Sequence, residues 1–178
     1  MILTLGPSLT SGDAVLDLAC GDGGLADFLP EQRYLGVDGN AGMVAAGRSH
    51  GRELVEADMN DFRPLKPVDA TTMFRGLYYA RDRRELFAHI AGYTTKKLVF
   101  DFNPREFRVD DVLTDLRAAG FGEIETRPFF VPQTRALPRP VLAALRRVER
   151  TPGAGLLLRR ASPSSAPRHP RATCRGRA

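Results

Sequence analysis

The stretch Val15-Leu-Asp-Leu-Ala-Cys-Gly-Asp-Gly-Gly24 constrains the fold of this chain more than any other part of the sequence. A mostly apolar run leads into a turn of small residues, and a segment with the pattern of a helix follows that turn. Small side chains let the backbone of such a turn lie close against a ligand, and amides at a helix start donate to polar ligand groups. The stretch therefore predicts a strand, a tight turn and a ligand-binding site.

Short apolar runs alternate with helical segments along most of the chain. The apolar runs predict strands at residues 14–18, 34–37, 53–57, 68–74, 97–101 and 121–131. Helices are predicted at residues 23–29 and 40–48, after the capping box at 82–85, from 109 to a stop at Gly120, and at 138–148. This alternation favours parallel strands with helices on both faces of the sheet. We expect an α/β fold of the Rossmann-like, doubly wound, mostly parallel kind.

The positive net charge is concentrated at the C-terminal end. Residues 159–178 contain six arginines and no acids, which leaves 20 of the 26 basic residues against 21 acidic ones in the remainder. A nucleic-acid surface needs a basic face on the folded domain, so we expect no nucleic-acid partner. Proline, serine and the lack of apolar periodicity predict a disordered tail at 159–178, after a domain at 1–158. Arg33, Arg48 and Arg52 are expected to lie on solvated surfaces.

The sequence contains no sign of a membrane or secretory protein. No apolar run approaches the length of about 18 residues that a membrane-spanning helix needs. The N-terminus lacks the basic flank and long apolar core of a signal peptide. The two cysteines, Cys20 and Cys174, indicate no disulfide framework, and no metal-ligand spacing is visible. We expect a cytoplasmic protein with no metal and no membrane partner.

Three acidic residues, Asp17, Asp38 and Asp58, lie at or near the ends of predicted strands. Because the carboxyl ends of parallel strands share one edge of a sheet, these acids are expected to converge there. Asp38 lies 15 residues after Gly23, near the spacing of an acid that binds a ribose. The turn itself fits the dinucleotide fingerprint G-x-G-x-x-A. Nicotinamide and nucleoside cofactors would both suit an acid at Asp38.

The other two acids favour a cofactor without phosphate. Asp17 precedes the turn, where it suits a cationic ligand better than a pyrophosphate, and Asp58 is placed to accept from an exocyclic adenine amine. A ligand with a sulfonium, an amino group, a ribose and an adenine fits all three acids. An NAD-dependent oxidoreductase is the first alternative, although the sequence has no catalytic histidine, lysine or tyrosine motif of a dehydrogenase.

In these motifs the chain resembles the class I S-adenosylmethionine-dependent methyltransferases, over roughly residues 13–131. Residues 17–23 match their first motif with Ala19 in place of the first glycine, residues 34–43 match the second, and residues 57–59 match the third. Residues 74–78 lie where their fourth motif follows strand four. The resemblance implies a set of residues that bind S-adenosylmethionine: Asp17, Ala19, Gly21, Gly23, Asp38, Gly39, Met43, Asp58, Met59, Phe74 and Arg75.

The resemblance also implies how the methionine half of the cofactor is held. The backbone of the turn at 19–23 would contact the methionine part, and Asp17 would orient its amino group through water. Phe74 and Arg75 would line the floor beneath the methyl donor.

For the nucleoside half, the same resemblance assigns four residues. Asp38 would hold the ribose hydroxyls, and Met43 would pack beside the nucleoside. Asp58 and the amide of Met59 would bind the adenine.

The activity implied is transfer of a methyl group from S-adenosylmethionine to a small-molecule acceptor. The reaction is an in-line displacement that depends chiefly on positioning, so a general base is optional and no catalytic residue is assigned. Relative to the family, the segment before the first strand is short, and the final antiparallel strand is truncated after 155–158. A homodimer that supplies the missing lid is one hypothesis. A catalytically degenerate nucleoside-binding module is the second alternative to an enzyme.

Five further residues have simple structural interpretations. His50 and His89 are expected to have structural roles, and Cys20 is expected to fit as a small residue in the turn rather than to react. Tyr78 and Tyr79 follow the fourth strand. The sequence does not decide whether they line an acceptor pocket or pack in the core.

Overall fold

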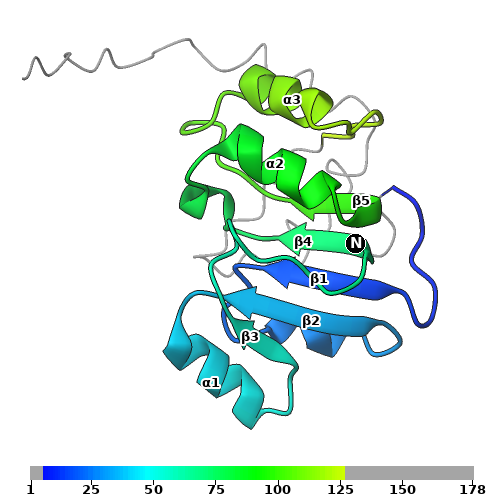
Figure 1. The fold of residues 1–178 in the computed structure, drawn as a ribbon, viewed down its shortest axis with the longest axis vertical. Helices are drawn as coiled ribbons and strands as arrows, with labels where there is room; N and C mark the ends of the chain where they lie inside the picture. The colour runs from blue at the N-terminus through cyan, green and yellow to red at the C-terminus, as the bar shows by residue number, and fades with distance from the viewer. Residues whose placement is uncertain (1–5, 127–178) are drawn as a thin grey trace, which may run out of the picture. The chain divides into compact units, whose positions relative to one another are not determined.

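The computed structural model describes residues 6–126 of the chain. Five strands form one sheet in which every pairing is parallel: β1 Ala14–Leu18, β2 Arg33–Asp38, β3 Leu54–Glu56, β4 Val68–Met73 and β5 Thr94–Phe100. The helices are α1 Ala41–Ser49, α2 Arg83–Ala91 and α3 Val109–Ala118, with short 3-10 helices η2 Gly24–Phe28 and η3 Leu77–Tyr79 (Figure 1). Residues 6–124 fall in one compact unit. No helix within the described residues is long and apolar enough to cross a bilayer.

The strand order is β3-β2-β1-β4-β5. From β1 the chain moves outward to β2 and β3, and it then crosses back over the sheet to β4 and β5. The direction of winding therefore reverses between β1 and β4, and in open α/β sheets this switch point is where ligands bind, beyond the carboxyl ends of the strands.

Two separate cores lie on the two faces of the sheet. Leu16 packs in one core with Phe87 of α2 and Val112 of α3. Its neighbour Val15 packs in a second core with Val44 of α1. Because successive residues of a strand point to opposite faces, α2 and α3 cover one face and α1 covers the other. The predicted doubly wound α/β fold is confirmed.

Side chains cap the starts of α1 and α2, and the cap at Asp82 was expected from the sequence. The side chain of Asn40 accepts from the amide of Met43 at 3.1 Å, and that of Asp82 accepts from the amide of Glu85 at 2.9 Å. Each side chain supplies a partner to an amide that has none within the helix. At the C-terminal end of α3, Gly120 has a φ of +97°, which is the left-handed conformation in which glycine commonly ends a helix.

Two predicted elements differ in the structure. The helix expected at 23–29 is the 3-10 helix η2, in which the amides of Ala26 and Leu29 donate to carbonyls three residues earlier. Strand β5 begins at Thr94, three residues before the predicted start. Both differences concern the ends and tightness of an element rather than its existence.

The strand predicted at 121–131 is wrong over its described part, because residues 121–126 form no strand. Phe121 and Ile124 both pack against the core shared by α2 and α3. Two residues three apart point to opposite faces of a strand, so a strand could not bury both in one core. Residues 127–131 and the elements predicted at 138–148 and 155–158 lie outside the described residues, as does the domain boundary at 158.

Candidate functional site

The turn after β1 uses a left-handed backbone at alternate positions. Ala19, Gly21 and Gly23 have φ values of 52°, 60° and 75°. Glycine adopts this conformation without strain, whereas a residue with a Cβ pays about 1–2 kcal/mol. The spacing of the glycines follows from this backbone, and Ala19 stands at a position whose conformation suits glycine.

Two more glycines let neighbouring elements pack closely against the turn. A Cβ on Gly36 of β2 would lie 2.7 Å from the sulfur of Cys20, and a Cβ on Gly47 of α1 would lie 2.3 Å from the carbonyl oxygen of Asp22. Both separations are too short for a side chain. Because Gly36 and Gly47 have no side chains, the turn can pack closely between β2 and α1.

Arg52 holds the turn from the loop before β3. Its guanidinium donates to the carbonyl oxygen of Asp22 at 3.0 Å and pairs with the carboxylates of Asp22 at 3.1 Å and Asp27 at 2.8 Å. The Arg52 side chain is only 14% exposed, so the prediction that it lies in solvent is wrong. Arg33 and Arg48 are exposed as predicted. Arg52 therefore fixes the turn, a role that the sequence around it does not indicate.

Asp38, at the end of β2, is joined directly to the glycine turn. Its Oδ2 accepts from the amide of Gly21 at 2.7 Å, and its Oδ1 accepts from the amide of Asn40 at 2.8 Å. A carboxylate offers about four lone-pair positions, so each oxygen keeps capacity for one more donor. The side chain is half-buried. Asp38 is thus fixed by two amides and still able to accept from two adjacent hydroxyl groups.

Asp17 is buried beneath the turn rather than displayed at its surface. It is 4% exposed, and it accepts from the hydroxyls of Tyr34 at 2.9 Å and Thr72 at 2.6 Å. Burial raises the pKa of the Asp17 carboxyl to about 6, and the charge of Asp38 adds to this, against the two hydrogen bonds that lower it. Both carboxylate oxygens of Asp17 already accept from neighbouring side chains. Its role in orienting the amino group of the methionine part stays a prediction.

The end of β4 meets the turn after β1. Arg75 has a φ of 52°, and it and Ala19 are the two non-glycine residues with a positive φ among residues 6–126. A Cβ on Gly76 would lie 3.1 Å from the Cβ of Ala19, so the two turns touch. The amide of Arg75 donates to Asp101, which follows β5, at 2.5 Å. Left-handed residues of this kind cluster at ligand sites, and here they lie at the topological switch point.

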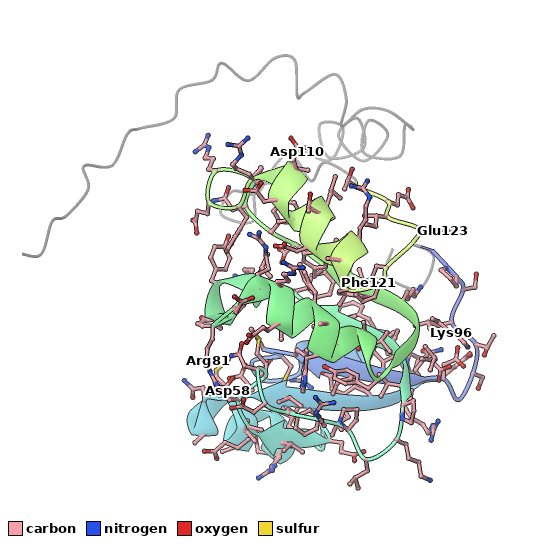
Figure 2. The ribbon with its side chains drawn as sticks, turned by 45° about the horizontal axis from the view of Figure 1, so that its top comes forward. Asp58, Arg81, Lys96, Asp110, Phe121 and Glu123 are labelled. Atoms are coloured by element: carbon pink, nitrogen blue, oxygen red, sulfur yellow. The ribbon has the colours of Figure 1, made fainter. Side chains whose placement is uncertain are left out.

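Asp58 lies at the far side of the same sheet edge, beyond the end of β3. Its Oδ2 pairs with Arg81 at 2.7 Å, and its Oδ1 accepts from both the amide and the side chain of Asn60 at 2.8 and 2.6 Å. The hydrogen bond from Arg81, helped by those from Asn60, lowers the pKa of the Asp58 carboxyl to about 2. Figure 2 shows Asp58 and Arg81 together, at the opposite end of the sheet from Lys96.

The remaining predicted residues lie in different surroundings. Met43 is 42% exposed, and its Cε lies 3.2 Å from where a Cβ would stand on Gly21. Gly39 is exposed and Phe74 is half-buried. The side chain of Met59 belongs to the core, which leaves only its backbone for a ligand. Met43 therefore lies beside the glycine turn, its packing against a nucleoside stays a prediction, and the side chain of Met59 is structural.

The five other residues singled out from the sequence are also placed. The imidazole of His89 hydrogen-bonds the carbonyl of Phe62 at 2.7 Å, and that of His50 hydrogen-bonds its own helix. Burial raises the pKa of the Cys20 thiol to about 12, which disfavours the reactive thiolate. Tyr78 and Tyr79 are 42% and 69% exposed. The two tyrosines therefore lie outside the core.

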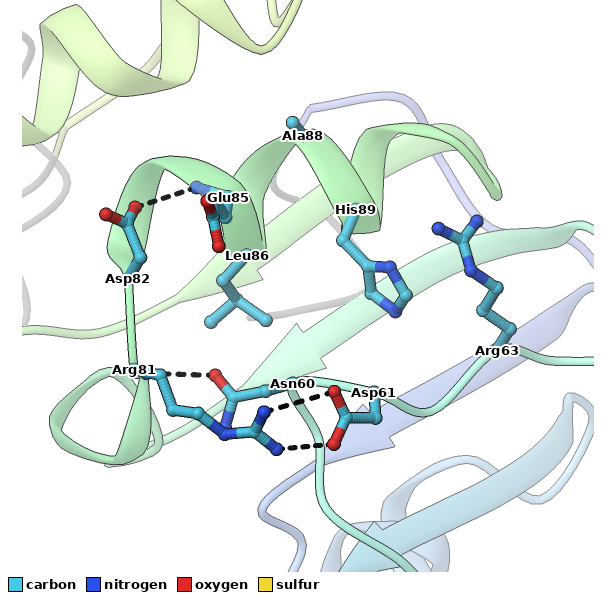
Figure 3. Close-up of a pocket in the computed structure, with 9 residues that line it drawn as sticks. All are labelled: Asn60, Asp61, Arg63, Arg81, Asp82, Glu85, Leu86, Ala88 and His89. Carbon is cyan, nitrogen blue, oxygen red and sulfur yellow. Dashed lines mark hydrogen bonds and ion pairs between the residues drawn. The ribbon is translucent and has the colours of Figure 1, made fainter.

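A groove of about 460 Å³ lies between α2 and the segment that follows β3 (Figure 3). Asp61 and Arg63 line one side, and Glu85 and His89 line the other. None of the predicted cofactor residues lines it. The groove is therefore separate from the cluster at the strand ends, which it borders at Arg81.

Residues 15–97 match the family described as a methyltransferase domain. This match supports the resemblance of residues 15–97 to the class I S-adenosylmethionine-dependent methyltransferases. The chain is 32% identical over 88 residues to trans-aconitate 2-methyltransferase of Escherichia coli. That match covers 46% of this chain and 35% of the relative, so the chain spans about a third of the length of the curated relatives it matches.

Two solved structures of methyltransferases share the fold of this chain. A TehB-like S-adenosylmethionine-dependent methyltransferase from Corynebacterium glutamicum has a TM-score of 0.56 at 18% identity, over 63% of this chain and 67% of that one. Magnesium protoporphyrin IX methyltransferase from Synechocystis PCC 6803, with bound S-adenosylmethionine, has a TM-score of 0.55 at 16% identity, over 62% and 60%.

Proposed function

We propose that this chain binds S-adenosylmethionine at the carboxyl ends of β1 to β4 and transfers its methyl group to a small-molecule acceptor. The observation that carries the proposal is the position of Asp38. Two amides orient its carboxylate, one of them from the glycine turn, and one lone pair remains on each oxygen. Two adjacent ribose hydroxyls are the donors that such a carboxylate suits.

The residues around Asp38 are consistent with a nucleoside held against the turn. Gly21 presents bare backbone, since a Cβ there would crowd the methyl end of Met43 at 3.2 Å. Met43 itself is part exposed beside this position, where its thioether can pack on a flat ring. The group of residues thus fits the nucleoside part of S-adenosylmethionine.

The chain's contribution to the chemistry is alignment. S-adenosylmethionine, when bound, supplies a methyl group activated by a sulfonium. The turn at Ala19–Gly23, fixed by Arg52 and Asp38, would hold the methionine part. Arg75, locked through its amide to Asp101, would form the floor on the acceptor side. A displacement of this kind gains its rate mainly from the orientation of the two partners.

The acceptor is proposed to be a small organic acid. The curated relative with 32% identity is named as a trans-aconitate methyltransferase. Arg75 is exposed at the end of β4, where a guanidinium suits a carboxylate of the acceptor. Trans-aconitate is therefore the first acceptor to test.

The test is a methyl-transfer assay with S-adenosylmethionine that carries a deuterated methyl group. The purified chain is incubated with trans-aconitate and, separately, with a panel of small acids and amines, and products are identified by mass spectrometry. We expect a labelled methyl ester of trans-aconitate, and little product from Asp38→Asn. A deuterated methyl group on another acceptor would overturn trans-aconitate as the substrate but would leave the methyltransferase activity standing. Binding of the cofactor without label on any acceptor would favour a non-catalytic nucleoside-binding module.

A further inference from the structure

Two loops at the sheet edge are joined by a network centred on Arg81. Its guanidinium pairs with Asp58 at 2.7 Å and also with both oxygens of Asp61. Its amide donates to the side chain of Asn60 at 3.0 Å. The Asn60 side chain in turn donates to the carbonyl of Tyr79 at 3.0 Å. The segment after β3 and the segment after η3 therefore hold each other in place through side chains.

This network leaves one accepting position on Asp58. Its Oδ1 already accepts from two donors of Asn60, at 2.8 and 2.6 Å. Its Oδ2 accepts from Arg81 alone, and an oxygen of a carboxylate accepts about two hydrogen bonds. The free capacity is thus on Oδ2, next to a guanidinium that fixes where this oxygen lies.

We propose that Arg81 is a positioning residue that makes the purine site select a 6-amino group over a 6-oxo group. The inference rests on the proposed function, since it takes Asp58 as the acceptor for the purine. Arg81 orients the carboxylate of Asp58, which is ionised at neutral pH, so that Oδ2 accepts a hydrogen bond and cannot donate one. An exocyclic amine satisfies this oxygen. A 6-oxo group places a second acceptor against it, and two facing acceptors repel.

The shape of the Arg81 side chain suits this positioning role. Its guanidinium contacts Asp58 and Asp61 together. The planar guanidinium spans two carboxylates at once, which an ammonium group cannot do with the same geometry. Arg81→Lys is therefore expected to preserve the charge but to position Asp58 less well than arginine.

The test compares two ligands that differ only at the purine: S-adenosylhomocysteine and S-inosylhomocysteine. Their dissociation constants are measured by calorimetry on the full chain, and the ratio of the two is the readout. We expect the unmodified chain to prefer the adenine ligand by about ten-fold or more, as expected for a hydrogen bond to a charged group. Arg81→Ala should reduce the preference to about three-fold or less, and Arg81→Lys should give an intermediate value.

Two further variants separate selectivity from folding. Asp58→Asn offers an amide that can donate, and it should shift the preference toward the inosine ligand. Arg83→Ala removes an arginine that pairs with Asp115 between α2 and α3, and its ratio should equal that of the unmodified chain. A purely structural role for Arg81 would weaken both ligands by the same factor and leave the ratio unchanged.

The outcomes distinguish this inference from the function on which it rests. If the adenine ligand binds and Arg81→Ala keeps the full preference, the role of Arg81 is overturned while the cofactor assignment stands. The same holds if Asp58→Asn keeps the full preference. If the unmodified, folded chain binds neither ligand, both the cofactor assignment and the role of Arg81 are overturned.

Discussion

The methyl group of Ala19 lies 3.1 Å from the position that a Cβ would take on Gly76, so the turns after β1 and β4 are in contact. The contact joins the two strands between which the winding of the sheet reverses. Ala19 has a φ of 52° in this turn, and the strain of that backbone is held at the candidate cofactor site.

Replacing Ala19 with glycine is expected to stabilise the fold. The substitution removes the steric strain of an alanine in the left-handed conformation. The free energy of unfolding should rise by about 1 kcal/mol after the entropy cost of glycine is subtracted. The free energy of unfolding, measured by urea titration, tests this. Ala45→Gly in the exposed part of α1 is the matched control and should lose about 1 kcal/mol. Equal losses in both variants would show that the backbone at Ala19 carries no strain.

Removing the side chain of Arg52 is expected to loosen the glycine turn. The guanidinium contacts Asp22 and Asp27, and its loss leaves both carboxylates without their cation. Arg52→Ala should lower the midpoint of thermal unfolding and weaken the binding of S-adenosylhomocysteine. Arg33→Ala, which loses one hydrogen bond from an exposed side chain to the carbonyl of Gly12, is the control and should change both quantities less. Larger effects of Arg33→Ala than of Arg52→Ala would show that Arg52 does not stabilise the turn.

The buried carboxyl of Asp17 is expected to make stability depend on pH. Its pKa is raised from 3.8 to about 6 by burial, so the folded state holds this proton more tightly than the unfolded chain. The contribution of Asp17 is therefore greatest below about pH 4 and falls as the pH rises through 6. Asp17→Asn mimics the protonated form and removes this dependence.

The prediction for Asp17 is tested by urea titrations of both proteins between pH 4 and pH 8. The free energy of unfolding of the unmodified chain, relative to Asp17→Asn, should fall by about 2–3 kcal/mol across this interval. Parallel curves for the two proteins would show that the folded and unfolded states bind this proton equally. Asp58 does not affect the comparison, because it is present in both proteins and contributes equally to both curves.

The features that the sequence predicted well are those written in local patterns. The strand Ala14–Leu18 depends on an apolar run, and the cap at Asp82 depends on a side chain that reaches an amide three residues away. The order of the acids along the edge follows once the strands are parallel. These parts of the fold and site required no knowledge of distant contacts.

The features that were missed depend on contacts between distant segments. Arg52 reaches carboxylates 30 and 25 residues earlier in the chain, and nothing in the pattern around it indicates this. The pairing of Asp58 with Arg81 and the burial of Asp17 against Thr72 likewise arise only when separate strands and loops meet. The wrong strand at 121–126 has the same origin, because one core takes up both of its apolar side chains.

The most direct test of the central claim is calorimetric titration of the purified chain with S-adenosylhomocysteine and with NADH. The variants are Asp38→Asn and, as the control, Asp111→Asn on the exposed part of α3. We predict micromolar binding of S-adenosylhomocysteine to the unmodified chain and the control, no binding of NADH, and a loss of about ten-fold or more in Asp38→Asn. Failure of the folded chain to bind S-adenosylhomocysteine, or equal binding by Asp38→Asn, would contradict the claim.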